Sequence, residues 1–197
     1  DEDGFITLLD LSTGGLVSDR KNNVRIGSDQ DDVIAGICDD PNDPNSFYVV
    51  GATKGDVNGI VDGDITVEVG SLEAFVMKMN AQSLKATWTR QWGAKNGEAL
   101  TQAMALGCVV AGDVVYVTGN VENGAGMVLG QEIKTSQGGN DVWVAQMQVS
   151  DGTENWLEQI GTSGDEQVAR NGGIVADNAG NAIIFGDTTL ATKRSTC

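Results

Sequence analysis

Apolar and polar residues alternate along several short stretches of this chain, and such alternation is typical of β-strands that bury one face. The clearest case is 73–80, where Phe75, Met77 and Met79 occupy every second position. A weak helical spacing at 99–106 is assigned to a strand, because the corresponding segments elsewhere in the chain have strand patterns. The pattern therefore predicts an all-β protein.

Several motifs return along the chain with a period of about 67 residues, which indicates an internal repeat. Gly51, Gly119 and Gly186 each end a run of β-forming residues and lie 68 and 67 positions apart. Trp88 and Trp156 are also 68 positions apart. Two longer motifs recur, one at 3–9, 73–79 and 141–147 and the other at 25–27, 91–93 and 159–161.

Each repeat is predicted to contain four antiparallel strands, named a, b, c and d in chain order. Short turns at 12–15, 81–83 and 150–153 join strands c and d. Long polar segments at 53–71 and 121–140 join strands b and c. The expected strands are a at 33–38, 101–110 and 168–176, b at 46–52, 113–120 and 181–187, c at 4–10, 73–80 and 141–149, and d at 24–26, 86–92 and 154–160.

Four such strands per repeat are typical of a β-propeller blade. The segments Glu73 to Met79, Trp88 to Gly93 and Val115 to Gly119 read E-A-F-V-M-K-M, W-T-R-Q-W-G and V-Y-V-T-G. They resemble the seven-bladed β-propeller repeat family, whose repeat reads D-A-F-V-A-K-L-D, then W-x-x-Q-x-G, then D-x-x-G-N-x-Y-V-T-G. Asp177 to Asn181 matches the turn between strands a and b, whereas Asp39 to Asn45 departs from it through an inserted D-P-N-D-P-N.

The resemblance implies propeller blades, and the family motif carries no catalytic residue. Residues 1–27 would form the c–d half of a blade, 28–93 and 94–161 full blades, and 162–197 an a–b half. The chain then holds about three blade-equivalents, whereas closed propellers use about 4 to 8. We therefore expect a part of a larger propeller or assembly. The first strand c and the last strand b should pair with another chain, with further blades of the same polypeptide, or with each other.

Charge narrows the possible partners. The chain has 12 Lys and Arg against 28 Asp and Glu, a net charge of −16, which argues against nucleic acid and against an anionic membrane surface. Its apolar runs fall short of the roughly 18 residues that a spanning helix needs, so membrane insertion is not expected. The chain contains no His, the commonest general base, which lowers the expectation of an enzyme.

Acidic loops offer a candidate calcium site. In an up-and-down blade the d–a and b–c loops emerge on the same face, which would bring two groups of oxygen ligands together. An EF-hand is excluded, because Ile60, Val61 and Val67 occupy its fifth, sixth and twelfth positions. A solvated turn rich in Asp, Asn and Gly is the competing interpretation. The candidate ligands are Asp29 and Asp31, with Asp32 beside them, and Asp56, Asn58, Asp62 and Asp64.

Cysteine and aromatic residues leave further alternatives open. Cys38 and Cys108 align in the repeat and are interpreted as small packing residues, with a disulfide between blades as the alternative; the state of Cys197 stays open. Phe5, Phe75 and Trp143 are expected at one site in successive sheets, as are Trp88 and Trp156. The tryptophans, which also include Trp92, are interpreted as inter-blade core rather than as a sugar-stacking set.

These observations predict a non-enzymatic structural or protein-interaction β-propeller module, and the resemblance implies that it belongs to a secreted, wall-associated or surface protein. A calcium-assisted carbohydrate or matrix binder is the alternative, with Ca²⁺ as its cofactor. A propeller lyase or hydrolase is the least favoured hypothesis. Neighbouring carboxylates such as Asp31 and Asp32 are poor candidates for a hydrolytic pair, because adjacent strand residues point to opposite faces.

Overall fold

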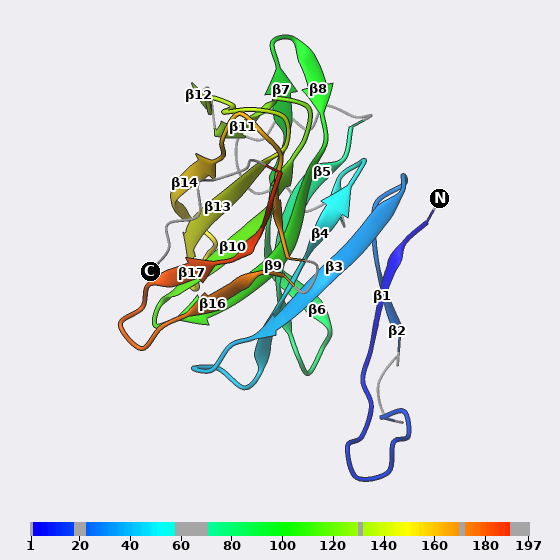
Figure 1. Ribbon diagram of the computed structural model, residues 1–197. Coiled ribbons are helices and arrows are strands. Elements are labelled where there is room, and N and C mark those ends of the chain that lie inside the picture. Colours follow the sequence, from blue (N-terminus) through cyan, green and yellow to red (C-terminus); the bar gives the residue numbers. More distant parts are fainter. Residues whose placement is uncertain (1, 18–22, 58–70, 130–131, 170–171, 190–197) are drawn as a thin grey trace.

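Two four-stranded antiparallel sheets form the body of the protein. The computed structural model describes residues 2–17, 23–57, 71–129, 132–169 and 172–189, and strands are the regular elements there (Figure 1). The first sheet has the order β3 (Asp32–Asp39), β4 (Ser46–Thr53), β5 (Glu73–Asn80) and β6 (Lys85–Trp92). The second has the order β9 (Ala103–Ala111), β10 (Val114–Val121), β13 (Asp141–Gln148) and β14 (Glu154–Ile160). The prediction of an all-β chain with four-stranded antiparallel sheets is confirmed.

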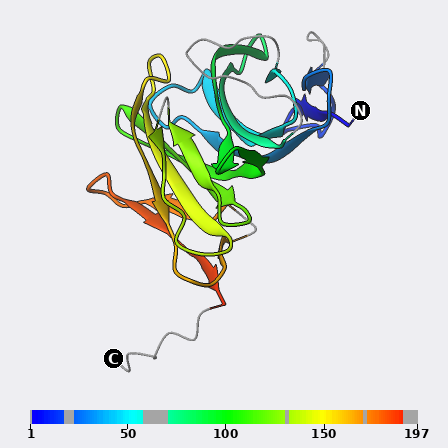
Figure 2. The ribbon, with the colours of Figure 1, turned by 90° about the horizontal axis from the view of Figure 1, so that it is seen from above.

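Shorter strand pairs flank the two sheets. β1 (Gly4–Thr7) pairs with β2 (Asn23–Ile26). At the other end, β15 (Glu166–Val168) pairs with β18 (Gly186–Thr188), and β16 (Ile174–Ala176) pairs with β17 (Ala182–Ile184). Figures 1 and 2 show the blue β1–β2 pair at one side of the molecule and the orange and red strands at another, with the two sheets between them.

The last pair of predicted strands differs from the expectation. Strand a at 168–176 and strand b at 181–187 are each divided into two short strands. The division follows from Gly172 and Gly173, whose φ angles of 92° and 48° lie outside the strand region and turn the backbone between β15 and β16.

A third, smaller sheet forms where polar loops were expected. Its order is β12 (Glu132–Ile133), β11 (Gly126–Leu129), β7 (Ala94–Asn96) and β8 (Ala99–Thr101). β7 belongs to the d–a loop and β11 to the b–c loop, and Met127 pairs with Ala94 across them. The expectation that these two loops lie on one face is therefore correct, although their secondary structure was missed.

Apolar side chains fill the space between the two sheets. Trp92 from β6 and Trp143 from β13 meet there, with their ring centroids 5.5 Å apart. A second cluster joins β1 and β2 to the first sheet through Ile6, Ile26 and Phe75. Each of these groups thus packs against the next one along the chain.

The recurring glycines have a steric cause. Gly51, Gly119 and Gly186 lie beside an irregularity in the pairing of strands a and b. A Cβ atom on them would collide with the backbone oxygens of Val33, Met104 and Gln167, respectively. Only glycine therefore fits at these positions.

The expected equivalence of aromatic residues holds with one correction. Phe75 and Trp143 are both fully buried, and they lie opposite Gly51 and Gly119. Phe5 is 70% exposed, so the expectation that it is buried at the same kind of site is wrong. The reason is that Phe75 packs against Ile6 and Ile26 of β1 and β2, and Trp143 packs against Trp92 of the first sheet, whereas no described sheet covers the corresponding face of β1.

Trp88 and Trp156 occupy equivalent positions, as predicted. Trp88 packs on Tyr48 with ring centroids 5.7 Å apart, and Trp156 packs on Tyr116 at 6.1 Å. Trp88 is buried, whereas Trp156 is half-buried. Each tryptophan thus packs on a tyrosine of its own sheet, Tyr48 of β4 for Trp88 and Tyr116 of β10 for Trp156.

Candidate functional site

The residues predicted to bind calcium belong to two loops that meet beside the first sheet. A side chain at Gly55, just after β4, would meet Ser28 and Asp29 of the loop before β3. Asp29 and Asp56 are exposed. The remaining candidates of the longer loop, Asn58, Asp62 and Asp64, lie outside the described residues.

Asp31 forms an ion pair with Lys54. Its Oδ2 lies 2.8 Å from Nζ of Lys54, and its Oδ1 accepts a hydrogen bond of 3.2 Å from the backbone N–H of Glu2. The Lys54 hydrogen bond, followed by the Glu2 N–H, holds the pKa of Asp31 below its ordinary value. A cation at this carboxylate would have to compete with the ammonium group of Lys54.

No group of three or more His, Cys, Asp or Glu side chains is arranged as metal ligands within the described part of the chain. The calcium site therefore stays a prediction that depends on the loop containing Asp62 and Asp64. Asp31 and Asp32, the example of neighbouring carboxylates, have different partners, which are Lys54 for Asp31 and Ser28 for Asp32.

Asp32 serves to close a loop. It is buried, and its Oδ2 accepts hydrogen bonds from the N–H of Ser28 at 2.6 Å and from the Ser28 hydroxyl at 3.0 Å. Glu166 repeats this arrangement with the N–H of Thr162 at 2.7 Å. The hydroxyls of Thr162 and Thr188 lower the pKa of Glu166. Both carboxylates thus fix the chain just before a strand a.

A second recurring contact was missed in the sequence, and we name it the acid–amide clamp. Nε2 of Gln91 donates to Oε2 of Glu73 at 2.8 Å and to the backbone oxygen of Gly55 at 3.0 Å. Nε2 of Gln159 donates to Oδ2 of Asp141 at 2.7 Å and to the oxygen of Ala125 at 2.9 Å.

Each clamp fastens strands c and d to the b–c loop. The first strand pair uses an ion pair instead, with Nε of Arg25 2.6 Å from Oδ2 of Asp3. The sequence contained a signal for these contacts. The acidic partner is the first residue of the motif at 3–9, 73–79 and 141–147, and the amide or guanidinium partner is the first residue of the motif at 25–27, 91–93 and 159–161.

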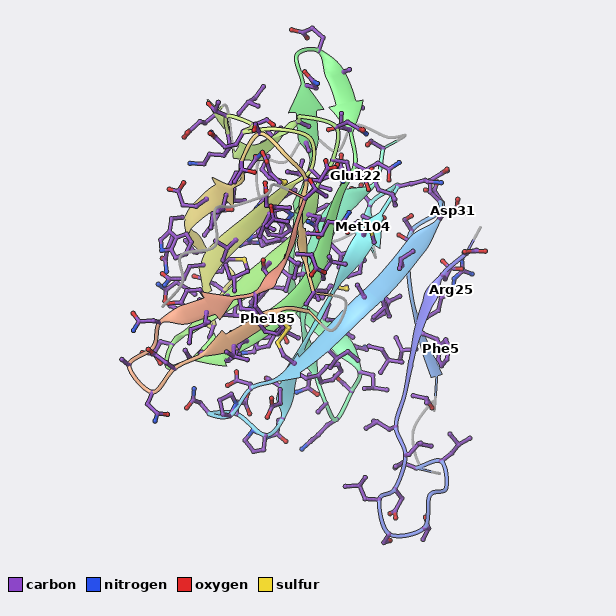
Figure 3. The ribbon with its side chains drawn as sticks, in the orientation of Figure 1. Phe5, Arg25, Asp31, Met104, Glu122 and Phe185 are labelled. Atoms are coloured by element: carbon purple, nitrogen blue, oxygen red, sulfur yellow. A yellow bond between two sulfur atoms is a disulfide. The ribbon has the colours of Figure 1, made fainter. Side chains whose placement is uncertain are left out.

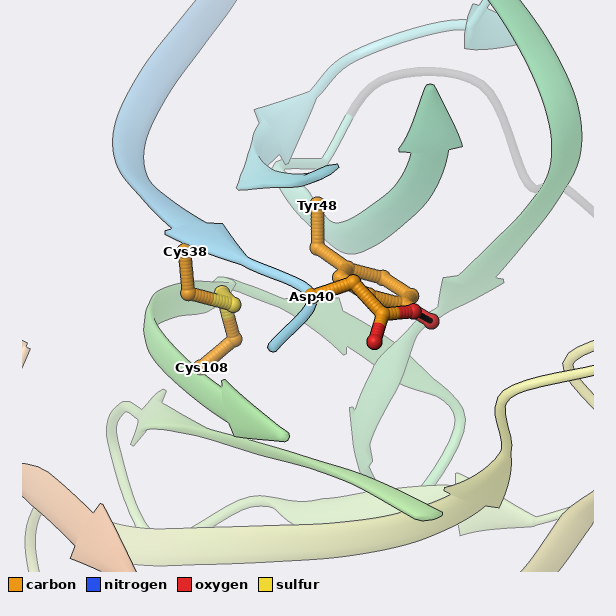
Figure 4. Close-up of a disulfide and its surroundings, with 4 residues drawn as sticks. All are labelled: Cys38, Asp40, Tyr48 and Cys108. Atoms are coloured by element: carbon orange, nitrogen blue, oxygen red, sulfur yellow. Dashed lines mark hydrogen bonds between the residues drawn. A yellow bond between two sulfur atoms is a disulfide. The ribbon is translucent and has the colours of Figure 1, made fainter. Parts of the chain in front are cut away.

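A disulfide joins Cys38 of β3 to Cys108 of β9, with a Cα–Cα distance of 5.8 Å (Figure 4). The preferred interpretation of these residues as free packing thiols is wrong, and the alternative of a bond between neighbouring sheets is correct. The two strands come close because Gly36 has no side chain: a Cβ there would lie 3.0 Å from the backbone oxygen of Leu106. Cys197 lies outside the described residues.

Buried polar groups lie near the disulfide, between the two sheets. The hydroxyl of Tyr48 donates to Oδ2 of Asp40 at 3.3 Å (Figure 4). Nζ of Lys78 lies 3.7 Å from the same oxygen and donates to the backbone oxygen of Val149 at 3.2 Å. Burial, and then the charge of Asp40, raise the pKa of Tyr48. Val149 directly follows β13 of the second sheet. The hydrogen bond from Lys78 therefore links the two sheets.

The tryptophans support the core interpretation over a sugar-stacking set. Trp88, Trp92 and Trp143 are buried. Nε1 of Trp88 donates to the backbone oxygen of Val149 at 3.1 Å, and Nε1 of Trp92 donates to Oε2 of Glu154 at 2.7 Å. Both bonds cross from the first sheet to the second, so these rings hold the sheets together.

Comparison of the chain with protein-family models, curated proteins and solved structures finds no match. Across the described residues, no helix is long and apolar enough to cross a membrane.

Proposed function

We propose that the protein is a non-enzymatic β-propeller module that serves as a structural or protein-interaction unit of a secreted, wall-associated or surface protein. The observation that carries this proposal is the bond between Cys38 and Cys108, which ties the first strands of two successive four-stranded sheets together. Neighbouring blades of a propeller are related in this way, with their first strands near a common axis.

The disulfide also supports the proposed location. Such bonds form and persist in secreted and surface proteins and are rare in the reducing cytosol. The excess of carboxylates keeps the surface strongly negative, which favours solubility.

The buried charged side chains in the described part of the chain support a scaffold role. Asp40 and Lys78 are used between the sheets, and Glu73 and Asp141 are used in the acid–amide clamps. These side chains hold strands and loops in place, whereas catalytic carboxylates need access to a substrate.

One experiment separates this function from its two alternatives. The labelled protein is applied to arrays of extracellular-matrix proteins and of polysaccharides, in Ca²⁺ and in chelator, and product release from the polysaccharides is measured in parallel. We expect binding to proteins, unchanged by chelator, and no product release. Sugar binding that requires Ca²⁺ would favour the carbohydrate-binding alternative, and release of sugar products would favour a lyase or hydrolase.

A further inference from the structure

Two asparagine–glycine pairs lie among the described residues, Asn96–Gly97 and Asn123–Gly124. In such a pair the backbone nitrogen of the glycine can attack Cγ of the asparagine, because the glycine has no Cβ atom to hinder the approach. The reaction needs a carboxamide that can rotate and a glycine N–H that is not held by another group. The fold meets both conditions at the first pair and withholds the second condition at the other.

The Asn96–Gly97 pair lies in an open hairpin turn, which we name the β7–β8 hairpin. Gly97 and Glu98 join the two strands, since Asn96 pairs with Ala99. Gly97 has a φ of 62°, which suits glycine at the first position of a two-residue turn. In the view of Figures 1 and 3 the hairpin projects at the top of the molecule, beyond the labelled Glu122.

The surroundings of Gly97 leave its nitrogen accessible. Asn96 and Gly97 are both exposed, and a Cβ atom on Gly97 would meet nothing within 4 Å. Among the described residues, no hydrogen-bond partner is found for the N–H of Gly97. The backbone can therefore change its conformation at this turn without disturbing a neighbouring segment.

The backbone of the Asn123–Gly124 pair is held in place. The N–H of Gly124 donates to the backbone oxygen of Gly139 at 2.6 Å. The N–H of Asn123 donates to Oδ1 of Asn140 at 3.2 Å. A Cβ atom on Gly124 would lie 3.1 Å from the backbone oxygen of Gly138, so a second segment is packed against this glycine. An attack by the Gly124 nitrogen therefore requires the loop to open first.

The side chain of Asn96 connects the two loops. Its Nδ2 donates to the backbone oxygen of Asn123 at 3.0 Å, in an exposed position. Water can replace an exposed hydrogen bond at a small cost in free energy, so the carboxamide is able to rotate. The amide group that would react is thus the group that ties the β7–β8 hairpin to the loop before β11.

From this contrast we propose that Asn96 is a self-modification site, at which deamidation cuts the connection between the β7–β8 hairpin and residues 122–125. The Gly97 nitrogen bonds to Cγ of Asn96 and gives up its proton, the Cγ–Nδ2 bond breaks, and ammonia leaves a cyclic imide. Water then opens the ring at one of its two carbonyls. The product is aspartate or, when the backbone runs through the former side chain, isoaspartate. The inference is independent of the proposed function.

The product cannot restore the connection. An ionised carboxylate accepts hydrogen bonds but has no N–H to donate to the oxygen of Asn123. It also adds a negative charge to a turn that already contains Glu98. The released segment ends at Ala125, whose backbone oxygen still accepts the hydrogen bond from Gln159. The change is therefore confined to the hairpin and the start of the b–c loop.

Peptide mapping by mass spectrometry tests the site, after incubation of the protein in mildly alkaline buffer. In the folded protein we expect Asn96 to be converted about 10-fold faster than Asn123 or more, because opening a backbone hydrogen bond reduces the reactive population by that order. In urea with a reductant the two rates should be similar. Equal rates in the folded protein, or a difference that persists in urea, overturns the proposal. Mapping also keeps Asn58 and Asn171, which lie outside the described residues, apart from these sites.

Hydrogen exchange tests the consequence for the loop. Asn96→Asp reproduces the aspartate product, and amide exchange at residues 122–125 should accelerate by up to about 10-fold. Ala99→Asp adds the same charge at an exposed position of the same hairpin but keeps the Asn96 amide, so it is the matched control and should exchange like the wild type. Wild-type exchange in Asn96→Asp would show that the Asn96 amide does not hold the loop, and would overturn this part of the proposal.

Discussion

Trp92 and Trp143 meet between the two four-stranded sheets, with ring centroids 5.5 Å apart and planes tilted by 53°. This tilted geometry lets the edge of one ring meet the face of the other, which is favourable for aromatic pairs. Trp92 also reaches Glu154 of the second sheet through its indole N–H. The pair therefore combines apolar burial with a polar connection between the sheets.

Trp143→Ala should destabilise the protein by about 3–5 kcal/mol, because it removes a fully buried ring and leaves a cavity beside Trp92. Urea unfolding followed by circular dichroism measures the change. Leu11→Ala is the control: Leu11 is fully exposed, and its loss should change stability by less than about 0.5 kcal/mol. An equally small effect of Trp143→Ala would contradict the described core.

Replacing both Cys38 and Cys108 by Ser should lower the free energy of unfolding by about 2–5 kcal/mol. The bond closes a long loop, with a sequence separation of 70, and restricts the unfolded chain accordingly. Thermal melts with and without a reducing agent give the comparison. The reductant should lower the melting temperature of the wild type and leave the double variant unchanged, and a reductant effect in both would point to another cause.

Glu154→Gln should raise stability at neutral pH. Burial raises the pKa of Glu154 above 4.5, while the Trp92 hydrogen bond lowers it by less. The folded protein then keeps this proton to a higher pH than the unfolded chain, so the wild type loses stability as pH rises through that range.

The variant should melt higher than the wild type at pH 7, and the difference should disappear at pH 3. Gln keeps an oxygen that can accept the Trp92 hydrogen bond. Glu158→Gln, at an exposed position of the same strand, serves as the control and should melt like the wild type at both pH values. A lower melting temperature of Glu154→Gln at pH 7 would show that the charge stabilises the fold.

Calcium should act on the melting temperature only if the acidic loops bind it. An ion bound to the folded state alone stabilises it by mass action, whereas screening makes Ca²⁺ and NaCl of equal ionic strength act alike. Because Asp31 is already paired with Lys54, we expect the screening outcome. A specific Ca²⁺ response should be lost in Asp62→Asn with Asp64→Asn; if it persists there, these two residues are not ligands.

Strand positions could be predicted where apolar and polar residues alternate clearly. The predicted strand at 73–80 coincides with β5, because its alternation is strong and it pairs with a strand on each side, β4 and β6. The exposure of Phe5 could not be predicted from its aromatic character, since burial requires another sheet packed on that face of the strand as well as an apolar side chain.

Contacts between sheets were harder to predict than the strands. The bond between Cys38 and Cys108 depends on how closely β3 and β9 approach, and this follows from Gly36 lying against the backbone at Leu106. The acid–amide clamp of Glu73 and Gln91 spans two motifs, which were recognised as repeat markers but not as partners. Distances within a sheet follow from strand periodicity, whereas distances between sheets depend on side-chain packing.

The disulfide also sets the path of a mechanical load along the chain. β4, β5, β6, β7 and β8 all lie between the two cysteines in sequence, so tension applied to the ends passes from β3 to β9 through the sulfur atoms. These five strands inside the loop carry none of that tension while the bond is intact. Reduction would add them to the load path and release about 240 Å of extended chain. The redox state of this one bond would therefore decide how far each molecule can be stretched.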